Sequence, residues 1–373
     1  MTVKKNIRKL LAVILSLSLL AALLAGCSDS SATKDNTPPS PSGNSSTSPD
    51  NGNSTDTAFK GEPIELKLAH NNASTTPTAK MIQEWSDRIY EATEGTVSIV
   101  QYPSDSLGAT TSGLDMLDTG IADLLWSTTG MFAGTFNYLD TFALPLLGQE
   151  SSVSGTKAIW DTYETWGEQI DGDFSGFKLL ITYQSEGGII GSNDRISSVA
   201  DLKGDVVRSV AGSMADFITA CGGSPTFMPP GDIYTNMQKK VIDDYVFEWA
   251  GVESFKLAEL TPYYLSMNVY RVPMFIIISE SAWNKLSPDQ QAAVEALSYR
   301  EGSLVFAEGN DAAEAAYVGA SVSAGHTELI EPSEEEYAEF LSVAESVWTA
   351  RVDALKDGEA YFADVQANIA ANQ

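Results

Sequence analysis

Alternating strand and helix patterns occur twice in succession along this chain, and this repetition restricts the possible folds more than any other feature. The first series predicts strand, helix, strand, helix and strand over residues 64–70, 78–93, 95–103, 111–120 and 121–127. The second series predicts the same order over residues 205–210, 213–223, 225–229, 232–240 and 241–249. Strands that alternate with helices form parallel sheets with right-handed crossovers. Because the two series share no sequence repeat, they predict two α/β lobes.

The segments beside these series predict how the lobes are joined. A helix is expected over 153–170 and a strand over 177–184. The strongly β stretch 270–279 would return the chain to the first lobe. Within the second series, Ser213 is expected to cap its helix.

Two capping patterns mark the start of the C-terminal helices. Ser287 is followed by Pro288 and Gln290, which predicts a long helical region reaching about Ala324. Ser333 and Glu336 stand in capping-box register and begin the terminal helices. The C-terminal part of the chain is therefore expected to be helical.

The N-terminus has the pattern of a secretion signal. Positive charges precede an apolar run over 10–24, which ends at Leu-Ala-Gly-Cys27. We predict a lipoprotein signal over 1–26 and a lipid on Cys27, although an ordinary signal peptide with an incidental cysteine would give the same pattern. The Ser-, Asn- and Pro-rich stretch up to residue 60 has too few apolar residues to form a core, so 27–60 is expected to be a disordered tether. The folded part would then lie at the outer face of a membrane.

Charge and residue usage argue against several classes of function. The formal net charge of −28 disfavours binding to nucleic acid or to an anionic membrane surface. With Cys27 lipidated, Cys221 has no disulfide partner and is expected to be a small core residue. The chain has two histidines, His70 and His326, and lacks the common hydrolase, metalloprotease and nucleotide-binding motifs, so we expect no enzyme. His70 follows a strand and could line a pocket or be an ordinary loop residue.

Arg208 is the residue that points most directly to a ligand. It is one of seven arginines and interrupts the apolar strand "DVVRSV", just before a predicted helix N-terminus. Ligands of open α/β sheets gather at the carboxyl ends of the strands, and a guanidinium beside helix N–H groups favours a carboxylate. A structural ion pair with one of the many acidic residues is the alternative, and the residues alone leave both open.

From about Ile64 to Leu297 the chain resembles the extracytoplasmic solute receptors of TRAP transporters, carriers driven by an ion gradient. The matching stretches, in order, are "KLAHNNAS", "EATEGTVSIVQYPSDSLG", "LDTGIADL", "FALPLL", "SVADLKGDVVRSVAGS", "CGGSPTFMPPGDIYTNMQKKVIDD" and "SAWNKLSPDQQAAVEAL". The resemblance implies an α/β, two-lobed fold like that of periplasmic binding proteins, with a hinge and a long C-terminal helix. The expected parts are lobe I (61–185 plus 274–313), lobe II (186–273) and a C-terminal helical region packing on both lobes (314–373).

The resemblance also implies a function and a set of site residues. It makes the chain a receptor that closes around a small organic acid, a C4-dicarboxylate or a related mono- or keto-carboxylate, and delivers it to TRAP membrane subunits. Arg208 takes the position that binds the ligand carboxylate in the family. The place of a second arginine in sialic-acid-type members falls on Gly188, that of a polar residue on Phe247, and that of a glycine on Asp244. These departures favour a smaller or more apolar carboxylate. By alignment, the first lobe would contribute four lining residues: Asn71, Thr110, Trp126 and Thr128.

The stretch "FEWAG" adds a further expectation from the resemblance. It is similar to a Glu-Trp pair that binds a metal beside the carboxylate in keto-acid-binding members, so Glu248 is a candidate cation ligand. Trp249 would then be a pocket wall, although a strand tryptophan is as often a core residue. A receptor for an ABC importer or a sensor kinase, and more distantly a secreted lipoprotein enzyme, are the competing hypotheses.

Overall fold

The computed structural model describes residue 59, residues 61–323 and residues 328–373, and all of them belong to the unit Thr57–Gln373. The predicted signal, Cys27 and the tether (apart from Phe59) lie outside the described residues, as do His326 and Ala324. None of the helices in the described part is long and apolar enough to cross a membrane.

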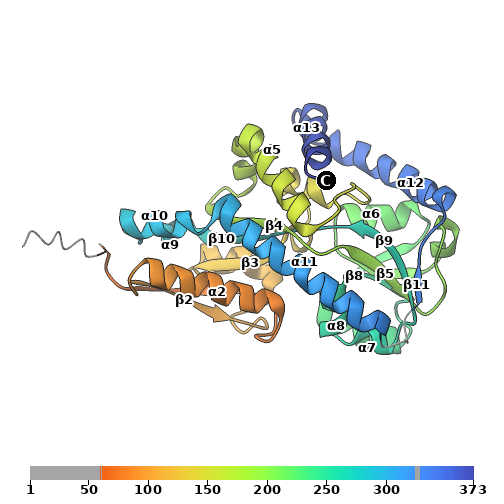
Figure 1. Ribbon diagram of the computed structural model, residues 1–373, viewed down its shortest axis with the longest axis horizontal. Coiled ribbons are helices and arrows are strands. Elements are labelled where there is room, and N and C mark those ends of the chain that lie inside the picture. Colours follow the sequence, from red (N-terminus) through yellow and green to blue (C-terminus); the bar gives the residue numbers. More distant parts are fainter. Residues whose placement is uncertain (1–58, 60, 324–327) are drawn as a thin grey trace, which may run out of the picture. The chain divides into compact units, whose positions relative to one another are not determined.

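The first of two sheets has the strand order β2-β1-β3-β10-β4 (Figure 1). Strand β1 is parallel to β2 and β3, whereas β10 is antiparallel to β3 and β4. The strands are β1 (Ile64–Ala69), β2 (Val97–Tyr102), β3 (Leu124–Thr128), β4 (Phe177–Gln184) and β10 (Pro273–Ser279). All five were predicted from the sequence within a few residues.

The second sheet has the order β11-β9-β5-β8-β6-β7. Here β6 is parallel to β7 and β8, and β5 is antiparallel to β8 and β9. The strands are β5 (Gly188–Ser192), β6 (Val206–Ser209), β7 (Ser224–Phe227), β8 (Asp244–Glu248), β9 (Tyr263–Tyr270) and β11 (Glu328–Ile330). The chain passes between the sheets at β4–β5 and at β9–β10. The antiparallel pairs of both sheets involve β5 or β10, one strand beside each crossing, and the remaining pairs are parallel.

Helices cover both faces of each sheet. Neighbouring residues of β3, Leu125 and Trp126, belong to different hydrophobic clusters, and so do Tyr245 and Val246 of β8. The α-helices are α2 (Pro77–Ala92), α3 (Gly113–Asp118), α4 (Asn137–Asp140), α5 (Ser152–Asp173), α6 (Ser213–Ala220), α7 (Pro230–Gln238), α8 (Trp249–Ser254), α9 (Glu280–Trp283), α10 (Pro288–Ala296), α11 (Tyr299–Ser323), α12 (Glu334–Val352) and α13 (Gly358–Ala371). This two-sheet α/β architecture with a long C-terminal helix confirms the predicted fold class.

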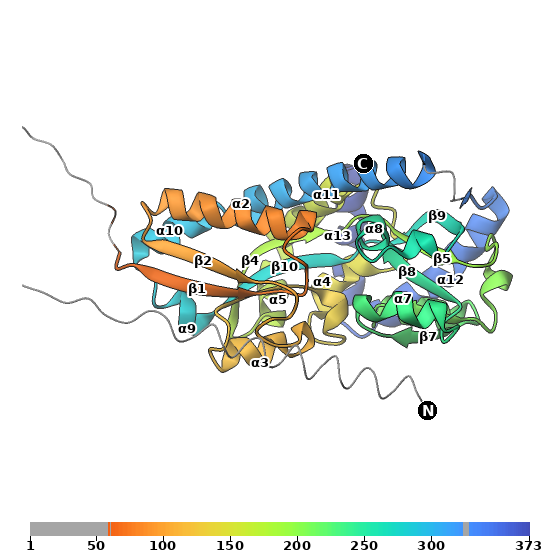
Figure 2. The same ribbon diagram turned by 90° about the horizontal axis from the view of Figure 1, so that it is seen from below.

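Helix α11 bridges the two halves of the fold. It packs against α2, α5 and β4 beside the first sheet and against α8 beside the second, as Figures 1 and 2 show. Helix α12 packs on α6, and α13 packs on α5. The C-terminal segment therefore contacts elements next to both sheets.

Three sequence-based expectations need correction. Ser213 is the first residue of α6 rather than its cap, because its hydroxyl donates to the Ala143 carbonyl at 3.0 Å while Gly212, at φ +83°, precedes the helix. The helix expected from Ser287 is broken before α11, where the Leu297 carbonyl accepts a hydrogen bond from the Trp85 indole. The segment 314–373 is not entirely helical, since β11 pairs with β9 at the edge of the second sheet.

Strands β5 and β9 were not predicted as strands. Strand β5 contains glycines because side chains of its neighbours lie across it: a Cβ at Gly191 would stand 2.4 Å from the Tyr245 ring. Glycine is disfavoured in strands unless another group approaches closely. The glycine-rich run "EGGIIGSN" therefore did not predict a strand.

Candidate ligand-binding site

Arg208 lies at the carboxyl end of β6 with its guanidinium held between two neighbouring strand ends. Its side chain is 1% exposed. Nη1 donates to the Val246 carbonyl of β8 at 2.9 Å, and Nε and Nη2 each donate to the Met228 carbonyl, just after β7, at 3.3 Å. The sequence places Arg208 here because parallel strands β6, β7 and β8 end at the same edge of the sheet.

The guanidinium has no carboxylate in ion-pair contact within the part of the chain that the structure describes. Three of its five N–H groups donate to carbonyls, and the other two have no acceptor among the described residues. Burial lowers the pKa of Arg208, and the nearby Tyr270 and Glu248 offset part of that effect. A buried, charged group with unused donors is costly unless an anion completes it. The geometry therefore fits the ion-pair alternative less well than the anion-site alternative.

An aromatic ring adjoins this guanidinium. The centre of the Phe247 ring lies 4.9 Å from Cζ of Arg208, within the range of a cation–π contact. Gly251 permits this placement, since a Cβ there would stand 2.3 Å from the Phe247 ring. Phe247 is thus the site residue, among those predicted from the sequence, that the structure brings directly against Arg208.

Gly188, Glu248 and Tyr270 form a second group beside Arg208. Gly188, the first residue of β5, pairs with Glu248 of β8 on one side and with Tyr270 of β9 on the other. The Tyr270 hydroxyl donates to Glu248 Oε1 at 2.8 Å. A Cβ at Gly188 would lie 2.2 Å from the Tyr270 ring. The Tyr270 ring therefore occupies the space that an arginine side chain at Gly188 would need.

The pKa of the Glu248 carboxyl is raised overall, because its burial outweighs the neighbours that lower it. Burial raises its pKa, while the hydrogen bond from Tyr270 and the charge of Arg208 lower it and Glu314 raises it. A metal ion here would meet one carboxylate, already bonded to a hydroxyl, and a guanidinium, which is a poor donor set for a cation. Among the described residues, no group of three or more His, Cys, Asp or Glu side chains is arranged to hold a metal ion. Glu248 as a cation ligand stays a prediction.

The first lobe faces this region through the ends of β1 and β3. Thr128 is the last residue of β3, Asn71 follows β1, and both are half-buried. Gly130, just after β3, lies against Val210, just after β6, because a Cβ on Gly130 would be 3.1 Å from the Val210 Cβ. The strand ends of the two lobes therefore meet near Arg208.

Two other polar residues considered for the first lobe are hydrogen-bonded to residues of the same lobe, Thr110 within its own loop and His70 to strand β2. Thr110 donates from both its amide and its hydroxyl to Asp105 Oδ1. His70 is buried with Nε2 bonded to Gln101 Oε1 at 2.9 Å, and burial lowers its pKa. These contacts favour a structural role for both side chains.

The two tryptophans lie in hydrophobic clusters. Trp126 is 4% exposed and its indole donates to the Tyr183 hydroxyl at 3.0 Å. Trp249 is 3% exposed and its ring centre lies 5.0 Å from that of Tyr264. Both placements favour the core over a pocket wall. Cys221 is likewise buried as a free thiol, as its residue type suggested.

Two buried charged residues at the crossings between the sheets, Arg271 and Glu186, were missed by sequence reasoning. Arg271 is 2% exposed, donates to the carbonyls of Gln149, Glu150 and Ser185, and pairs with Glu314 of α11 at 3.5 Å. Glu186 accepts a hydrogen bond from the Ala250 amide, and burial raises its pKa to about 8. An isolated charge between two β stretches, the same signal that singled out Arg208, would have identified Arg271.

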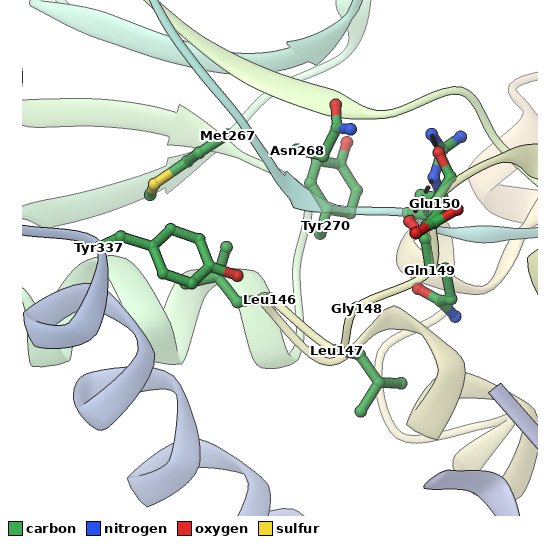
Figure 3. A pocket seen from close by; sticks show the side chains of 10 residues that line it. Leu146, Leu147, Gly148, Gln149, Glu150, Met267, Asn268, Tyr270 and Tyr337 are labelled. Carbon is green, nitrogen blue, oxygen red and sulfur yellow. Dashed lines mark hydrogen bonds between the residues drawn. The ribbon is translucent and has the colours of Figure 1, made fainter. Parts of the chain in front are cut away.

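A cavity of about 200 Å³ lies beside Arg271 rather than Arg208 (Figure 3). Met267, Tyr337 and Leu146 stand at one end of it and Gln149 and Glu150 at the other, with Tyr270 and Asn268 between. It adjoins the β9–β10 crossing through Tyr270 and Arg271.

Residues 68–353 match the model of the family described as bacterial extracellular solute-binding protein, family 7. The chain belongs to this family. This solute-binding protein is 23% identical over 294 residues to the C4-dicarboxylate-binding periplasmic protein DctP of Rhodobacter capsulatus, covering 74% of this chain and 83% of that one. Membership makes the chain a binding protein rather than an enzyme, and its family is extracytoplasmic.

Solved structures of TRAP solute-binding proteins share the fold. One from Bordetella bronchiseptica with bound (R)- and (S)-mandelate has a TM-score of 0.77 and 25% identity, covering 83% of this chain and all of that one (100%). Another, from a marine metagenome and specific for aromatic acids, has a TM-score of 0.77 and 22% identity, covering 83% of this chain and 99% of that one. The predicted assignment to the extracytoplasmic receptors of TRAP transporters is confirmed.

Proposed function

We propose that this receptor binds a small monocarboxylate with an apolar, preferably aromatic, body, and that Arg208 binds the carboxylate. The observation that supports this most is the buried guanidinium with two N–H groups that have no acceptor among the described residues. A planar carboxylate can accept two parallel hydrogen bonds from such a group. Binding would also offset the cost of burying the charge.

The surroundings of Arg208 favour one carboxylate and an apolar body. Tyr270 fills the space next to Gly188, so no second arginine stands there, and Glu248 adds negative charge beside the guanidinium. Phe247 offers an aromatic surface. The similar protein from Bordetella bronchiseptica holds an aromatic monocarboxylate, mandelate, whereas the Rhodobacter relative is named for C4-dicarboxylates. The local charges favour the first kind of ligand.

We infer that lobe I comprises 61–185 plus 274–313, that lobe II comprises 186–273, and that 314–373 packs on both. Membership of the strands in the two sheets supports this division, as do the contacts of α11 with α5 and α8. Closure of the lobes over the acid would bring Asn71 and Thr128 toward Arg208. A lipid on Cys27 with the 27–60 tether would hold the receptor at the membrane, where its loaded form docks on TRAP membrane subunits.

A thermal-shift screen tests the carboxylate assignment. Mandelate, benzoate, phenylacetate and succinate are added to the wild type, to Arg208→Met and to Arg195→Met, whose arginine is exposed and pairs with Glu328. An acid at 100 times its dissociation constant should stabilise the wild type and Arg195→Met by about 2.7 kcal/mol, and Arg208→Met by far less. If Arg208→Met keeps the full shift, Arg208 does not bind the carboxylate.

A further inference from the structure

Glu248 is held in one position at the edge of the proposed site. It is the last residue of β8, half-buried, and its Oε1 accepts the hydrogen bond of the Tyr270 hydroxyl at 2.8 Å. Tyr270 is itself 2% exposed and packs across Gly188. A carboxylate fixed by a buried hydroxyl cannot swing into solvent without breaking that bond, so its charge stays beside the site.

Glu248 belongs to the segment that contacts the guanidinium of Arg208: it directly follows Phe247, whose ring lies against Arg208, and Val246, whose carbonyl accepts from Nη1. Among its neighbours, Arg208 is the cation that acts on it, and Glu314 and Glu186 are the acidic groups that interact with it. The charge of Glu314 is already paired with Arg271. Arg208 in turn interacts with Glu248 and Tyr270 but makes no ion pair among the described residues. Among the described residues, Glu248 is thus the acidic side chain whose charge interacts with the Arg208 guanidinium without a hydrogen bond between them.

We propose that Glu248 determines which acids the receptor accepts: its fixed negative charge beside Arg208 admits one carboxylate and repels a ligand that brings a second. The inference rests on the proposed function, in which Arg208 binds the ligand carboxylate. Specificity of this kind comes from a repulsive element placed against the wrong ligand. Like charges in a partly buried site interact more strongly than in water, because little water screens them. Tyr270 acts as the positioning residue that keeps the charge in place.

Matched pairs of acids test this inference. In butyrate and succinate, and in 2-methylbenzoate and phthalate, a methyl group in the first acid is replaced by a carboxylate in the second. Dissociation constants are measured by calorimetry for the wild type, Glu248→Gln, Glu248→Asp and Glu186→Gln. The amide of Glu248→Gln can still accept the bond from Tyr270, so this variant removes the charge and keeps the contact. Glu186→Gln controls for the exchange of a carboxyl for an amide at a buried position of the same region, because Glu186 does not act directly on Arg208.

We expect the wild type to bind the methyl member of at least one pair about tenfold or more tightly than its dicarboxylate partner, a ratio equal to 1.4 kcal/mol. Glu248→Gln should reduce that ratio about tenfold, mainly by tightening the dicarboxylate. Glu248→Asp and Glu186→Gln should keep the wild-type ratio. Circular dichroism and the melting temperature of each unliganded variant check that the fold is intact.

Three other outcomes would overturn the inference in distinguishable ways. An unchanged ratio in Glu248→Gln, with the monocarboxylate still bound, rejects Glu248 as the determinant and leaves the proposed function standing. If Glu248→Gln loses affinity equally for both members of a pair, Glu248 contacts the shared part of the ligand or a cation beside it, and does not discriminate between the two acids. If the wild type binds none of the four acids and none of those in the thermal-shift screen, the proposed function fails and this inference fails with it.

Discussion

The two buried arginines of the second lobe and its hinge have opposite surroundings. Arg208 and Arg271 are 1% and 2% exposed. Arg271 uses its donors on three carbonyls and on the carboxylate of Glu314, so its charge and hydrogen bonds are satisfied within the protein. Arg208 donates only to two carbonyls, and two of its N–H groups have no acceptor among the described residues.

This difference separates a structural arginine from a binding one. Burying a charge is expensive, and a protein offsets the cost either with an internal counter-ion or with a ligand. Arg271 joins the loop at 149–150, the β4–β5 crossing and α11, which fixes the hinge. Arg208 is held in place by carbonyls at the ends of neighbouring strands and has donors left for an anion. Burial alone would not have distinguished them.

The largest expected effect comes from removing the satisfied arginine. Arg271→Met leaves Glu314 without its counter-ion and three carbonyls without a donor, so the free energy of unfolding should fall by about 3–5 kcal/mol. Urea denaturation followed by circular dichroism measures the loss. Arg300→Met is the control, because Arg300 forms a more exposed pair with Asp161 that should contribute less than about 1 kcal/mol. Equal losses in the two variants would contradict a structural role specific to Arg271.

Removing Arg208 should affect binding more than stability. The same denaturation experiment on Arg208→Met should show a smaller loss than Arg271→Met, since no described carboxylate loses a contact ion pair. Affinity for a bound monocarboxylate should fall about a hundredfold, or roughly 2.7 kcal/mol, because a buried charge pair is broken. Titration calorimetry with mandelate or benzoate, whichever the wild type binds, measures it. If Arg208→Met unfolds as readily as Arg271→Met, the two arginines do not differ in the way proposed.

An intermediate effect is expected where Tyr270 crosses β5 next to Arg208. Gly188→Ala places a Cβ 2.2 Å from the present position of the Tyr270 ring, so one of them must move. Overpacking of this kind should cost about 1–3 kcal/mol in the free energy of unfolding. In the Tyr270→Ala background the same change should cost much less, with a coupling of about 0.5–3 kcal/mol between the sites. If the losses in free energy of unfolding of Gly188→Ala and Tyr270→Ala simply add in the double variant, the Tyr270 ring does not require a glycine at position 188. Gly231→Ala is a control, since a Cβ at Gly231 meets nothing within 4 Å.

The sequence predicted the parts of this fold that have their own local signal. Strands such as β4 and β8 are apolar runs, and helix α2 is preceded by Thr76, whose hydroxyl caps it. Arg208 was identified because a charge inside an apolar strand requires a special reason. Strand β5 was missed because its glycines reflect side chains that reach it from β8 and β9, contacts that exist only after the sheet has formed.

The site was predicted less completely than the fold, for a related reason. Phe247 and Glu248 were expected from the family resemblance, and both lie on β8, next to the strand that carries Arg208. The role of Tyr270 depends on how the β9–β10 crossing returns beside Gly188, and the pairing of Arg271 with Glu314 joins residues 43 positions apart. Trp126 lies within β3 and Trp249 directly follows β8, and the local sequence of each is compatible with either a pocket or a core. Only the packing partners, Tyr183 and Tyr264, favour the core.

The last expected effect depends on pH and comes from Glu186, the hinge carboxylate that lacks a contact ion pair among the described residues. Burial raises its pKa from an ordinary value of 4.5 to about 8, although the Ala250 amide opposes the shift. Because the folded state holds the proton more tightly than the unfolded state, this group's stabilising contribution is complete below about pH 4.5 and is lost as the pH rises toward 8. Glu186→Gln should remove that decline, which for a shift of this size amounts to a few kcal/mol between pH 5 and pH 8, at about 1.4 kcal/mol per pKa unit. Urea denaturation at pH 5 and pH 8 measures it. Glu253→Gln serves as an exposed control, and an identical pH profile for Glu186→Gln and the wild type would mean that Glu186 does not titrate in this range.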